Sequence, residues 1–413
     1  MRTGTGGSVL SDRALRPAVA AQVVGVVGTH VAALALPTVA VLALAASPVA
    51  AAGLFALEYG AQALATPLLG VLVDRAGARR RRLLVAASTG NALAALAVPA
   101  AHLAGALSLP LLFAVAALTG VLSGLTAIGL QATVPRLVAP ERLVAANSAL
   151  AGAQSVGQIA GPAAAGALVQ TLGGALAMLA NAATHVLAAV AFGRLRPAPA
   201  EPTGRPPSSI FADLRAGIAA LRGRPVLVRI AVTTAALNLG GAAIGGLYVL
   251  YAYRELGLGP WLLGLTFAVN SVAAVVAAAT AGRVIGRLGP ARVVPVFAPV
   301  AGAALLLIPV ASVAPPVPTL ILYEAVFGYC ATVWLVAAVS LQQRIVPAHL
   351  LGRVLALSRT LGVLAIPVGA LAAGVVAQVR GVVPALVGFA MVAFAGTVVV
   401  VSRRVPPAPS PAD

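Results

Sequence analysis

The chain has 413 residues, of which 61% are hydrophobic and only 9% are charged, so its composition excludes an ordinary soluble globular protein. The formal net charge is +18, and all 27 basic residues are arginine. This charge could suit nucleic acid. The arginines gather between long apolar segments, however, as they do in membrane proteins, and we therefore expect no nucleic-acid partner.

Apolar runs of roughly 18 residues or more recur along the chain, and a helix of that length crosses the hydrocarbon layer of a bilayer. The runs lack the alternation of barrel strands, so we predict an all-α membrane protein with twelve transmembrane helices in two pseudosymmetric six-helix bundles. In chain order the predicted helices cover residues 17–46, 48–72, 83–104, 109–133, 143–169, 174–192, 226–251, 259–285, 293–313, 318–341, 353–378 and 382–402.

These helices divide the chain into four parts. They are an N-terminal half over residues 1–192, a linker over 193–225, a C-terminal half over 226–402 and a tail over 403–413. Within the linker, apolar residues at helical spacing predict a short amphipathic helix on the membrane surface. These residues are Phe211, Leu214, Ile218 and Leu221.

The arginines predict the orientation of the chain. All except Arg254 and Arg380 fall on one side of the predicted membrane. Because basic residues are enriched in cytoplasmic loops, we expect both termini to be cytoplasmic. The first apolar run is too long for the core of a cleaved signal peptide, so the first helix is expected to remain in the protein.

The two halves repeat each other in sequence. Residues before the third helix recur 212 positions later, before the ninth: Gly70, Arg75 and Gly77 match Gly282, Arg287 and Gly289. Residues of the fourth helix recur 208 positions later, in the tenth: Pro110 and Gly120 match Pro318 and Gly328. A duplicated helical unit is typical of transporters in which one half rocks against the other.

The segment between the second and third helices carries a motif. Its residues Gly70, Leu72, Asp74, Arg75, Gly77 and Arg79 resemble the loop 2–3 signature of the major facilitator superfamily. The resemblance implies transport by alternating access, with Gly70, Asp74, Arg75, Gly77 and Arg79 forming a conformational switch. In such a switch Asp74 would meet the start of the eleventh helix near Gly352, and Gly70 would allow close packing. We interpret Arg80, Arg81 and Arg82 only as a charged anchor outside the lipid.

Two further segments resemble a branch of that superfamily. The stretch from Leu130 to Asn147 is similar to bacterial efflux proteins of the enterobactin-exporter-like and macrolide-efflux-like kinds, which implies a bacterial cytoplasmic (inner) membrane. In the fifth helix, four residues resemble an exporter motif, although Ala165 replaces one of its usual glycines; they are Gly157, Gly161, Pro162 and Gly166. Plain helix packing is the alternative explanation for these glycines.

Two carboxylates lie inside predicted transmembrane helices, Glu58 in the second and Glu324 in the tenth. An acidic side chain costs about 2.5–3.5 kcal/mol in the middle of a bilayer, so each is expected to face a cavity or a partner. Both are proton-coupling candidates, with a structural hydrogen bond or a salt bridge as the alternative role. Ala116 stands where drug:proton antiporters usually carry an arginine, and Glu324 is its counterpart in the second half.

Other polar and aromatic residues of the apolar helices are candidates for lining a central cavity. They are His30, Gln62, Asn147, Gln154, Gln158, Asn238, Asn270, Tyr323 and Phe327. Aromatic walls with one or two carboxylates suit an amphipathic or cationic organic molecule. Hydrogen bonding between helices is the alternative role for these polar residues.

From these features we expect a secondary-active exporter of small amphipathic molecules, such as a drug, a macrolide or a siderophore-like compound. Its partners would be that substrate, protons and the lipid bilayer, and we expect a monomer. The proton gradient would supply the energy without a cofactor, because a phosphate-binding loop needs a lysine and the chain has none. We expect no metal site, since the histidines are scattered and Cys330 is the single cysteine. We expect no enzymatic activity, since no nucleophile, base and orienting group come together in the sequence. An importer or uniporter of a metabolite, or a membrane sensor that does not transport, remains the alternative.

Overall fold

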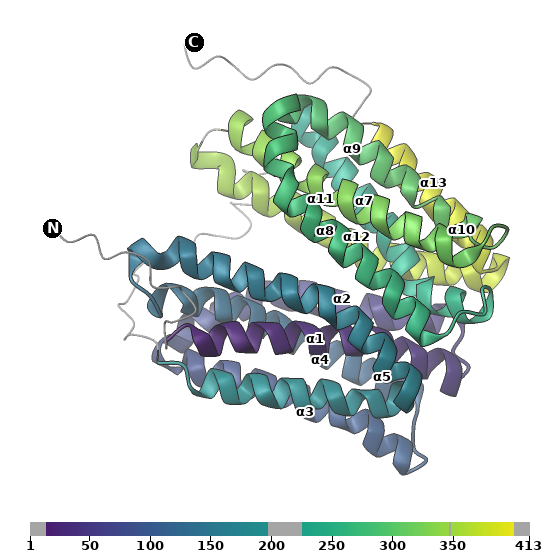
Figure 1. The fold of residues 1–413 in the computed structure, drawn as a ribbon, viewed down its shortest axis with the longest axis horizontal. Helices are drawn as coiled ribbons and strands as arrows, with labels where there is room; N and C mark the ends of the chain where they lie inside the picture. The colour runs from purple at the N-terminus through teal and green to yellow at the C-terminus, as the bar shows by residue number, and fades with distance from the viewer. Residues whose placement is uncertain (1–13, 197–224, 347, 400–413) are drawn as a thin grey trace. The chain divides into compact units, whose positions relative to one another are not determined.

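The structure is a computed structural model that describes residues 14–196, 225–346 and 348–399 (Figure 1). Throughout these ranges the regular elements are helices and there is no strand, which confirms the predicted all-α class. The amphipathic helix predicted around Phe211 and the predicted tail lie outside the described residues.

The first six spans are formed by five helical segments. These are α1 (Arg16–Thr38, extended by a π-helical turn at Val39–Ala43), α2 (Pro48–Ala76), α3 (Arg80–Leu103), α4 (Leu109–Thr133) and α5 (Leu143–Gly193). Helix α5 contains two spans, because Gly173 interrupts it with φ of 77°. Only glycine adopts that backbone conformation without strain.

The later part of the chain forms α7 (Pro225–Arg254), α8 (Pro260–Leu288), α9 (Pro290–Ala304), α10 (Leu307–Val310), α11 (Pro316–Ile345), α12 (Ala348–Arg380) and α13 (Val382–Val398). Several begin at a proline, whose fixed φ suits the first helical position and whose missing N–H costs nothing there. Within the described ranges, ten helices are long and apolar enough to cross a membrane. The second span of α5 and the shorter α13 complete the twelve predicted spans.

The structure corrects two predicted boundaries. The charged stretch after Gly70 is mostly helical, because α2 continues to Ala76 and α3 begins at Arg80 after a single 3-10 turn. A helix does not have to end where its apolar stretch ends, since charged residues continue it in water. The predicted helix over 293–313 is divided into α9 and α10, and Pro309 lies in the second piece.

The chain forms two compact units. The first unit comprises Met1–Ala45, Leu57–Thr203 and Gly259–Ala268, and the second comprises Ala46–Ala56, Gly204–Leu258 and Val269–Asp413. Helix α2 therefore gives its first residues to the second unit, and α8 gives its first residues to the first unit. The predicted boundaries of the halves, linker and tail stay predictions.

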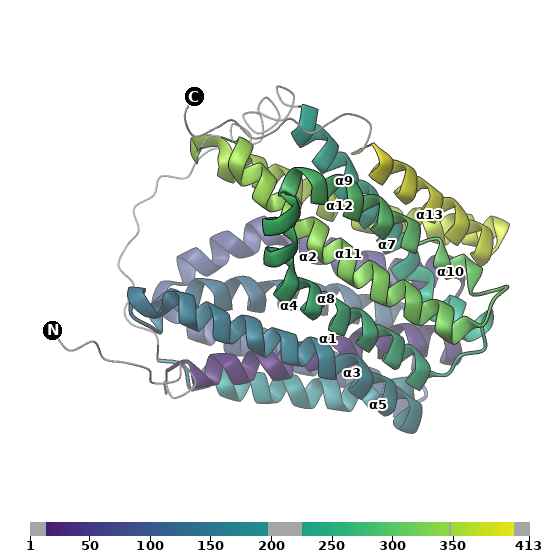
Figure 2. The ribbon, with the colours of Figure 1, turned by 45° about the horizontal axis from the view of Figure 1, so that its top comes forward.

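Each unit has its own packing. In the first unit α5 packs against α1 and α3, and α3 also packs against α4 (Figure 2). In the second unit α7 packs against α12 and α13, and α9 packs against α11 and α13. Buried apolar side chains fill both, including Leu84 and Phe192 in the first unit and Val333 and Leu341 in the second.

The internal repeat is visible in the geometry of corresponding helices. Gly381, which precedes α13, has φ of 94° and matches Gly173 within α5. The buried positions of α3 and α9–α10 coincide when Pro99 is aligned with Pro309. In that alignment Asn91 of the first unit corresponds to Ala301 of the second.

Candidate functional site

Glu324 of α11 is the most deeply buried carboxylate described in the structure, with a relative exposure of 4%. The side chains of Tyr248 on α7 and Asn270 on α8 are within hydrogen-bonding reach of its carboxyl group. Asn270 also donates from Nδ2 to the main-chain oxygen of Glu324 over 3.3 Å. Three helices of the second unit thus meet at this carboxyl group.

Aromatic rings adjoin Glu324. The ring centroid of Tyr323 lies 6.4 Å from that of Tyr248 and 5.6 Å from that of Phe327. The predicted candidates Asn270, Tyr323 and Phe327 therefore gather near the predicted carboxylate. The sequence analysis did not identify Tyr248. The one signal for it was that three of the six tyrosines of the chain lie in α7. A carboxyl group beside aromatic faces can hold an organic cation or an amphipathic molecule.

Glu58 lies at a close contact between α2 and α4 in the first unit. The side chain is half-buried. A Cβ atom added to Gly120 of α4 would overlap with the main-chain oxygen of Glu58, and one added to Gly124 would lie 3.1 Å from Cγ of Gln62. Glu58 and Gln62 therefore lie on the side of α2 that packs against α4.

The second unit repeats this contact. There, a Cβ atom on Gly328 of α11 would lie 2.7 Å from the main-chain oxygen of Asn270 on α8. Gly120 and Gly328 are the pair found in the sequence repeat, so the repeat is explained by two equivalent close helix contacts.

The glycines of the exporter-like motif form a packing surface on α5. A Cβ atom on Gly157 would lie 2.7 Å from Cβ of Val26, and one on Gly161 would lie 2.7 Å from Cδ2 of His30. One on Gly166 would lie 2.9 Å from Cα of Gly264, in the part of α8 that belongs to the first unit. The packing role named as the alternative is thus present, and Pro162 lies between the second and third of these contacts.

The remaining cavity candidates do not converge on one point. Asn147 and Gln154 are exposed and Gln158 is half-buried, whereas Gly157 on the same helix is buried. Asn238 packs beside Gly362 of α12, where an added Cβ atom would lie 2.9 Å from Nδ2 of Asn238. Their roles in a cavity stay predictions.

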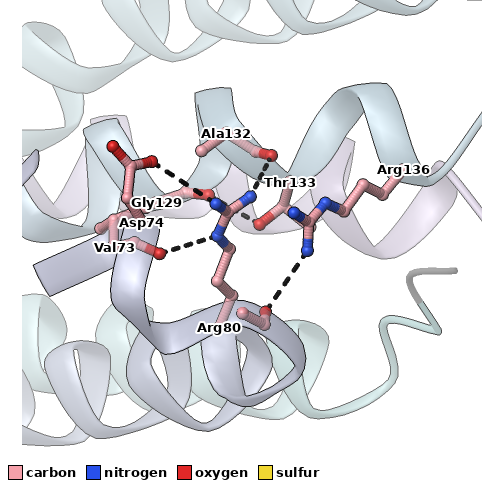
Figure 3. Close-up of polar contacts among 8 residues, drawn as sticks. Val73, Asp74, Arg80, Gly129, Ala132, Thr133 and Arg136 are labelled. Carbon is pink, nitrogen blue, oxygen red and sulfur yellow. Dashed lines mark hydrogen bonds and ion pairs between the residues drawn. The ribbon is translucent and has the colours of Figure 1, made fainter. Parts of the chain in front are cut away.

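Arg80 links the ends of two helices, and its interpretation as a mere anchor is wrong (Figure 3). Its Nε donates to the main-chain oxygen of Val73 over 2.8 Å, and its Nη1 donates to that of Ala132 over 2.9 Å. Its Nη2 lies 3.5 Å from Oδ1 of Asp74. The two carbonyl groups belong to the last turns of α2 and α4, where no N–H of the same helix is available. Arg80 is accordingly 8% exposed.

The same region contains a second arginine contact. Nη1 of Arg136, just after α4, donates to the main-chain oxygen of Gly77 over 3.4 Å (Figure 3). Gly77 has φ of 48°, which suits glycine at this tight turn. The side chain of Asp74 is 80% exposed. Among the described residues, nothing lies within 4 Å of a Cβ atom placed on Gly70, so they do not supply the close packing expected there.

The predicted partner of Asp74 is not tested. Side chains near Gly352 lie outside the described residues, and Arg75 and Arg79 are exposed. The switch role of the five motif residues therefore stays a prediction. No motif indicates the role of Arg80. The signal that could have found it is that the carbonyl groups at the ends of α2 and α4 need a hydrogen-bond donor.

The first unit also contains a polar cavity that the sequence did not predict. Its volume is about 130 Å³, and its polar lining residues are Gln22, Thr29, Ser88, Asn91, Ser123, Thr126 and His185. Among the described residues, Oγ of Ser88 and both amide atoms of Asn91 have no hydrogen-bond partner. The signal in the sequence was pairs of polar residues one turn apart in apolar helices, Ser88 with Asn91 and Ser123 with Thr126.

Two repeated helical units with close glycine contacts at equivalent places are typical of membrane transporters. Residues 18–370 match the model of the Major Facilitator Superfamily, and the chain belongs to this family. It is therefore a multi-pass membrane transporter that works by alternating access, rather than an enzyme.

Solved structures with the same fold agree with this assignment. A bacterial homologue of the human lysosomal transporter Spinster has a TM-score of 0.71 and 12% identity, covering 96% of this chain and 100% of that one. A mutant of the nucleoside transporter NupG has a TM-score of 0.77 and 12% identity, over 94% and 99%. A bacterial homologue of the iron transporter ferroportin has a TM-score of 0.72 and 18% identity, over 96% and 100%. No curated protein matches the sequence significantly.

Proposed function

We propose that this transporter is a proton-driven exporter of small amphipathic molecules, of a drug, macrolide or siderophore-like kind. We place it in a bacterial cytoplasmic membrane with both termini in the cytoplasm. The observation that carries the proposal is the burial of Glu324 among Tyr248, Tyr323 and Asn270.

The partners of Glu324 support a proton-exchanging role. A carboxylate in the middle of a bilayer costs about 2.5–3.5 kcal/mol unless a partner compensates for its charge. Tyr248 and Asn270 are neutral hydrogen-bond donors, so they orient the carboxyl group without cancelling its charge. Such a group can bind either a proton or a cationic part of a substrate, and this exclusive choice is what an antiporter requires.

The aromatic rings support the class of substrate. Tyr323 and Phe327 stack at 5.6 Å and 28°, and Tyr248 lies next to them. Flat apolar faces near one carboxyl group favour molecules that combine an apolar body with a positive charge. The direction of transport is supported by the exporter-like motif of α5 and by the resemblance of the stretch from Leu130 to Asn147 to efflux proteins.

The experiment is transport by the purified chain in liposomes of known orientation under an imposed pH gradient. A labelled panel of dyes, macrolides and siderophores supplies the substrate. We expect E324Q to reduce proton-driven flux at least about tenfold, since a neutral side chain cannot exchange a proton. The matched control is E255Q, which changes an exposed glutamate after the end of α7.

Two outcomes would contradict the proposal. Undiminished proton-dependent efflux by the double variant E58Q/E324Q would exclude both carboxylates as proton carriers. Flux of the substrate in the opposite direction under the same gradient would identify an importer.

A further inference from the structure

A groove on the outside of the first unit has the composition of a lipid site. Its volume is about 570 Å³, and it is lined by residues of α3 and the end of α5: Arg81, Arg82, Val85, Ala86, Thr89, Gly90, Leu93 and Gly193. Both ends of this groove have a distinct chemistry. Two arginines lie at one end, and apolar or small side chains form the rest.

The lining residues lie on one stripe of α3. Arg81, Val85, Thr89 and Leu93 follow one another at intervals of four residues, and such residues lie on the same side of a helix. At about 1.5 Å per residue, the stripe from Arg81 to Leu93 is about 18 Å long. One leaflet of a bilayer, headgroups included, is about 20 Å thick. The groove therefore has the length of a single leaflet.

Among the residues that the structure describes, the charged end of the groove has no protein partner. Arg81 and Arg82 are exposed, and within the described part of the chain neither makes an ion pair or a hydrogen bond. None of the described residues that line the groove is acidic. By contrast, the neighbouring Arg80 is buried and bonded. The consecutive arginines thus differ in function: Arg80 stabilises the helix ends, and the next two present free positive charge at the end of a membrane-spanning helix.

The other end of the groove is apolar and open. Leu93 is 64% exposed, and Ala86 and Thr89 are exposed beside it. Exposed leucine on a membrane-spanning helix faces hydrocarbon, because that is the surrounding solvent. A ligand with an anionic head and an apolar chain would match both ends of the groove.

We propose that this groove binds an anionic phospholipid, with the phosphate at Arg81 and Arg82 and one acyl chain along α3 as far as Leu93. Basic pockets at the cytoplasmic ends of membrane helices bind such headgroups by charge. The arginines lie at the end of α3 that the arginine distribution assigns to the cytoplasm. The corresponding stripe of α9 carries Ala291, Pro295 and Pro299, so it does not repeat this combination of residues.

The test measures binding of dioleoyl phosphatidylglycerol to the full chain in detergent by native mass spectrometry, with dioleoyl phosphatidylcholine as the neutral competitor. We expect wild type to prefer phosphatidylglycerol. Each arginine near an anionic lipid is worth about fivefold in affinity, so R81Q/R82Q should bind about 25-fold more weakly. The matched control is R283Q/R287Q, which removes two exposed arginines from the last turns of α8.

A third variant tests the groove itself. T89F keeps both arginines but fills the apolar part, and we expect it to lose most of the binding of phosphatidylglycerol. Size-exclusion profiles report whether each variant is folded. Equal loss in R81Q/R82Q and R283Q/R287Q, or full binding by T89F, would overturn the proposal. Displacement of the lipid by soluble glycerophosphoglycerol would indicate an anion site without an acyl-chain site and would overturn it as well.

Discussion

The interiors of the two units differ although their helices correspond. Aligned positions that are polar in the first unit are apolar in the second: Ser88, Asn91, Ser123, Thr126 and His185 correspond to Ala298, Ala301, Ala331, Trp334 and Ala393. The first set surrounds a cavity of about 130 Å³. In the second unit Trp334 is 3% exposed and packs with Ala298 and Ala301. The same arrangement of helices thus supports a polar cavity or a filled core, depending on side-chain volume at a few positions.

The carboxylates differ in a related way. In the first unit Glu58 lies on α2, and Ala116 stands on α4. In the second unit the carboxylate is on the other helix of the pair, because Glu58 corresponds to Asn270 of α8 and Ala116 corresponds to Glu324 of α11. Each unit therefore carries one carboxylate near its close glycine contact, but on a different helix of that contact. The backbone contact is the same in both units, and it does not determine which helix carries the charge.

The largest effect is expected where the two units are most alike. Gly120→Leu and Gly328→Leu should each prevent folding, because a Cβ atom at either position meets main-chain atoms that cannot move aside. Gly388→Leu is the matched control, since nothing lies within 4 Å of a Cβ atom there. Fluorescence-detected size exclusion after expression measures the result. A monodisperse peak for only one of the two glycine variants would show that the contacts are not equivalent.

A smaller effect on stability is expected to distinguish Arg80 of the first unit from Arg292, in the corresponding region of the second. Arg80→Ala removes two hydrogen bonds from a charged donor to carbonyl groups of α2 and α4, and we expect a loss of about 2–4 kcal/mol in the free energy of unfolding. Arg292→Ala, in the first turn of α9, should change it by less than about 0.5 kcal/mol because that side chain is exposed. Equilibrium unfolding in mixed micelles measures the free energy of unfolding of both variants. Equal stability of the two variants would contradict the role given to Arg80.

The smallest effects concern the two interiors. Ala301→Asn should destabilise by about 1–3 kcal/mol, because it places an unpartnered amide in an apolar core. Asn91→Leu should be neutral or stabilising by up to about 1 kcal/mol, since it removes an amide that has no partner among the described residues. Thermal unfolding in detergent measures both. A strongly destabilised Asn91→Leu variant would mean that ordered water or a ligand satisfies the amide.

Much of the fold could be predicted from the sequence because length and hydropathy determine membrane spans. The repeat of Gly120 and Gly328 could also be recognised in the sequence, since only glycine permits such close helix contacts. Arg80 and Tyr248 could not be assigned in this way. The role of Arg80 depends on Ala132, which is distant in sequence, and that of Tyr248 depends on Glu324.

The polar cavity escaped prediction for the same physical reason. Ser88 and Asn91 share one side of α3 and His185 lies on α5, but nothing in either helix indicates that they line one cavity. Periodicity reports which side of a single helix is buried, but it carries no information on which buried residues of different helices meet.

The placement of Trp334 has a spectroscopic consequence. The chain has two tryptophans. Trp261 is 45% exposed and belongs to the first unit, whereas Trp334 is 3% exposed and belongs to the second. The indole N–H of Trp334 has no hydrogen-bond partner among the described residues. Replacing Trp261 by phenylalanine would leave Trp334 as the one tryptophan, so its selectively excited emission would report the hydration of the second unit without any added label.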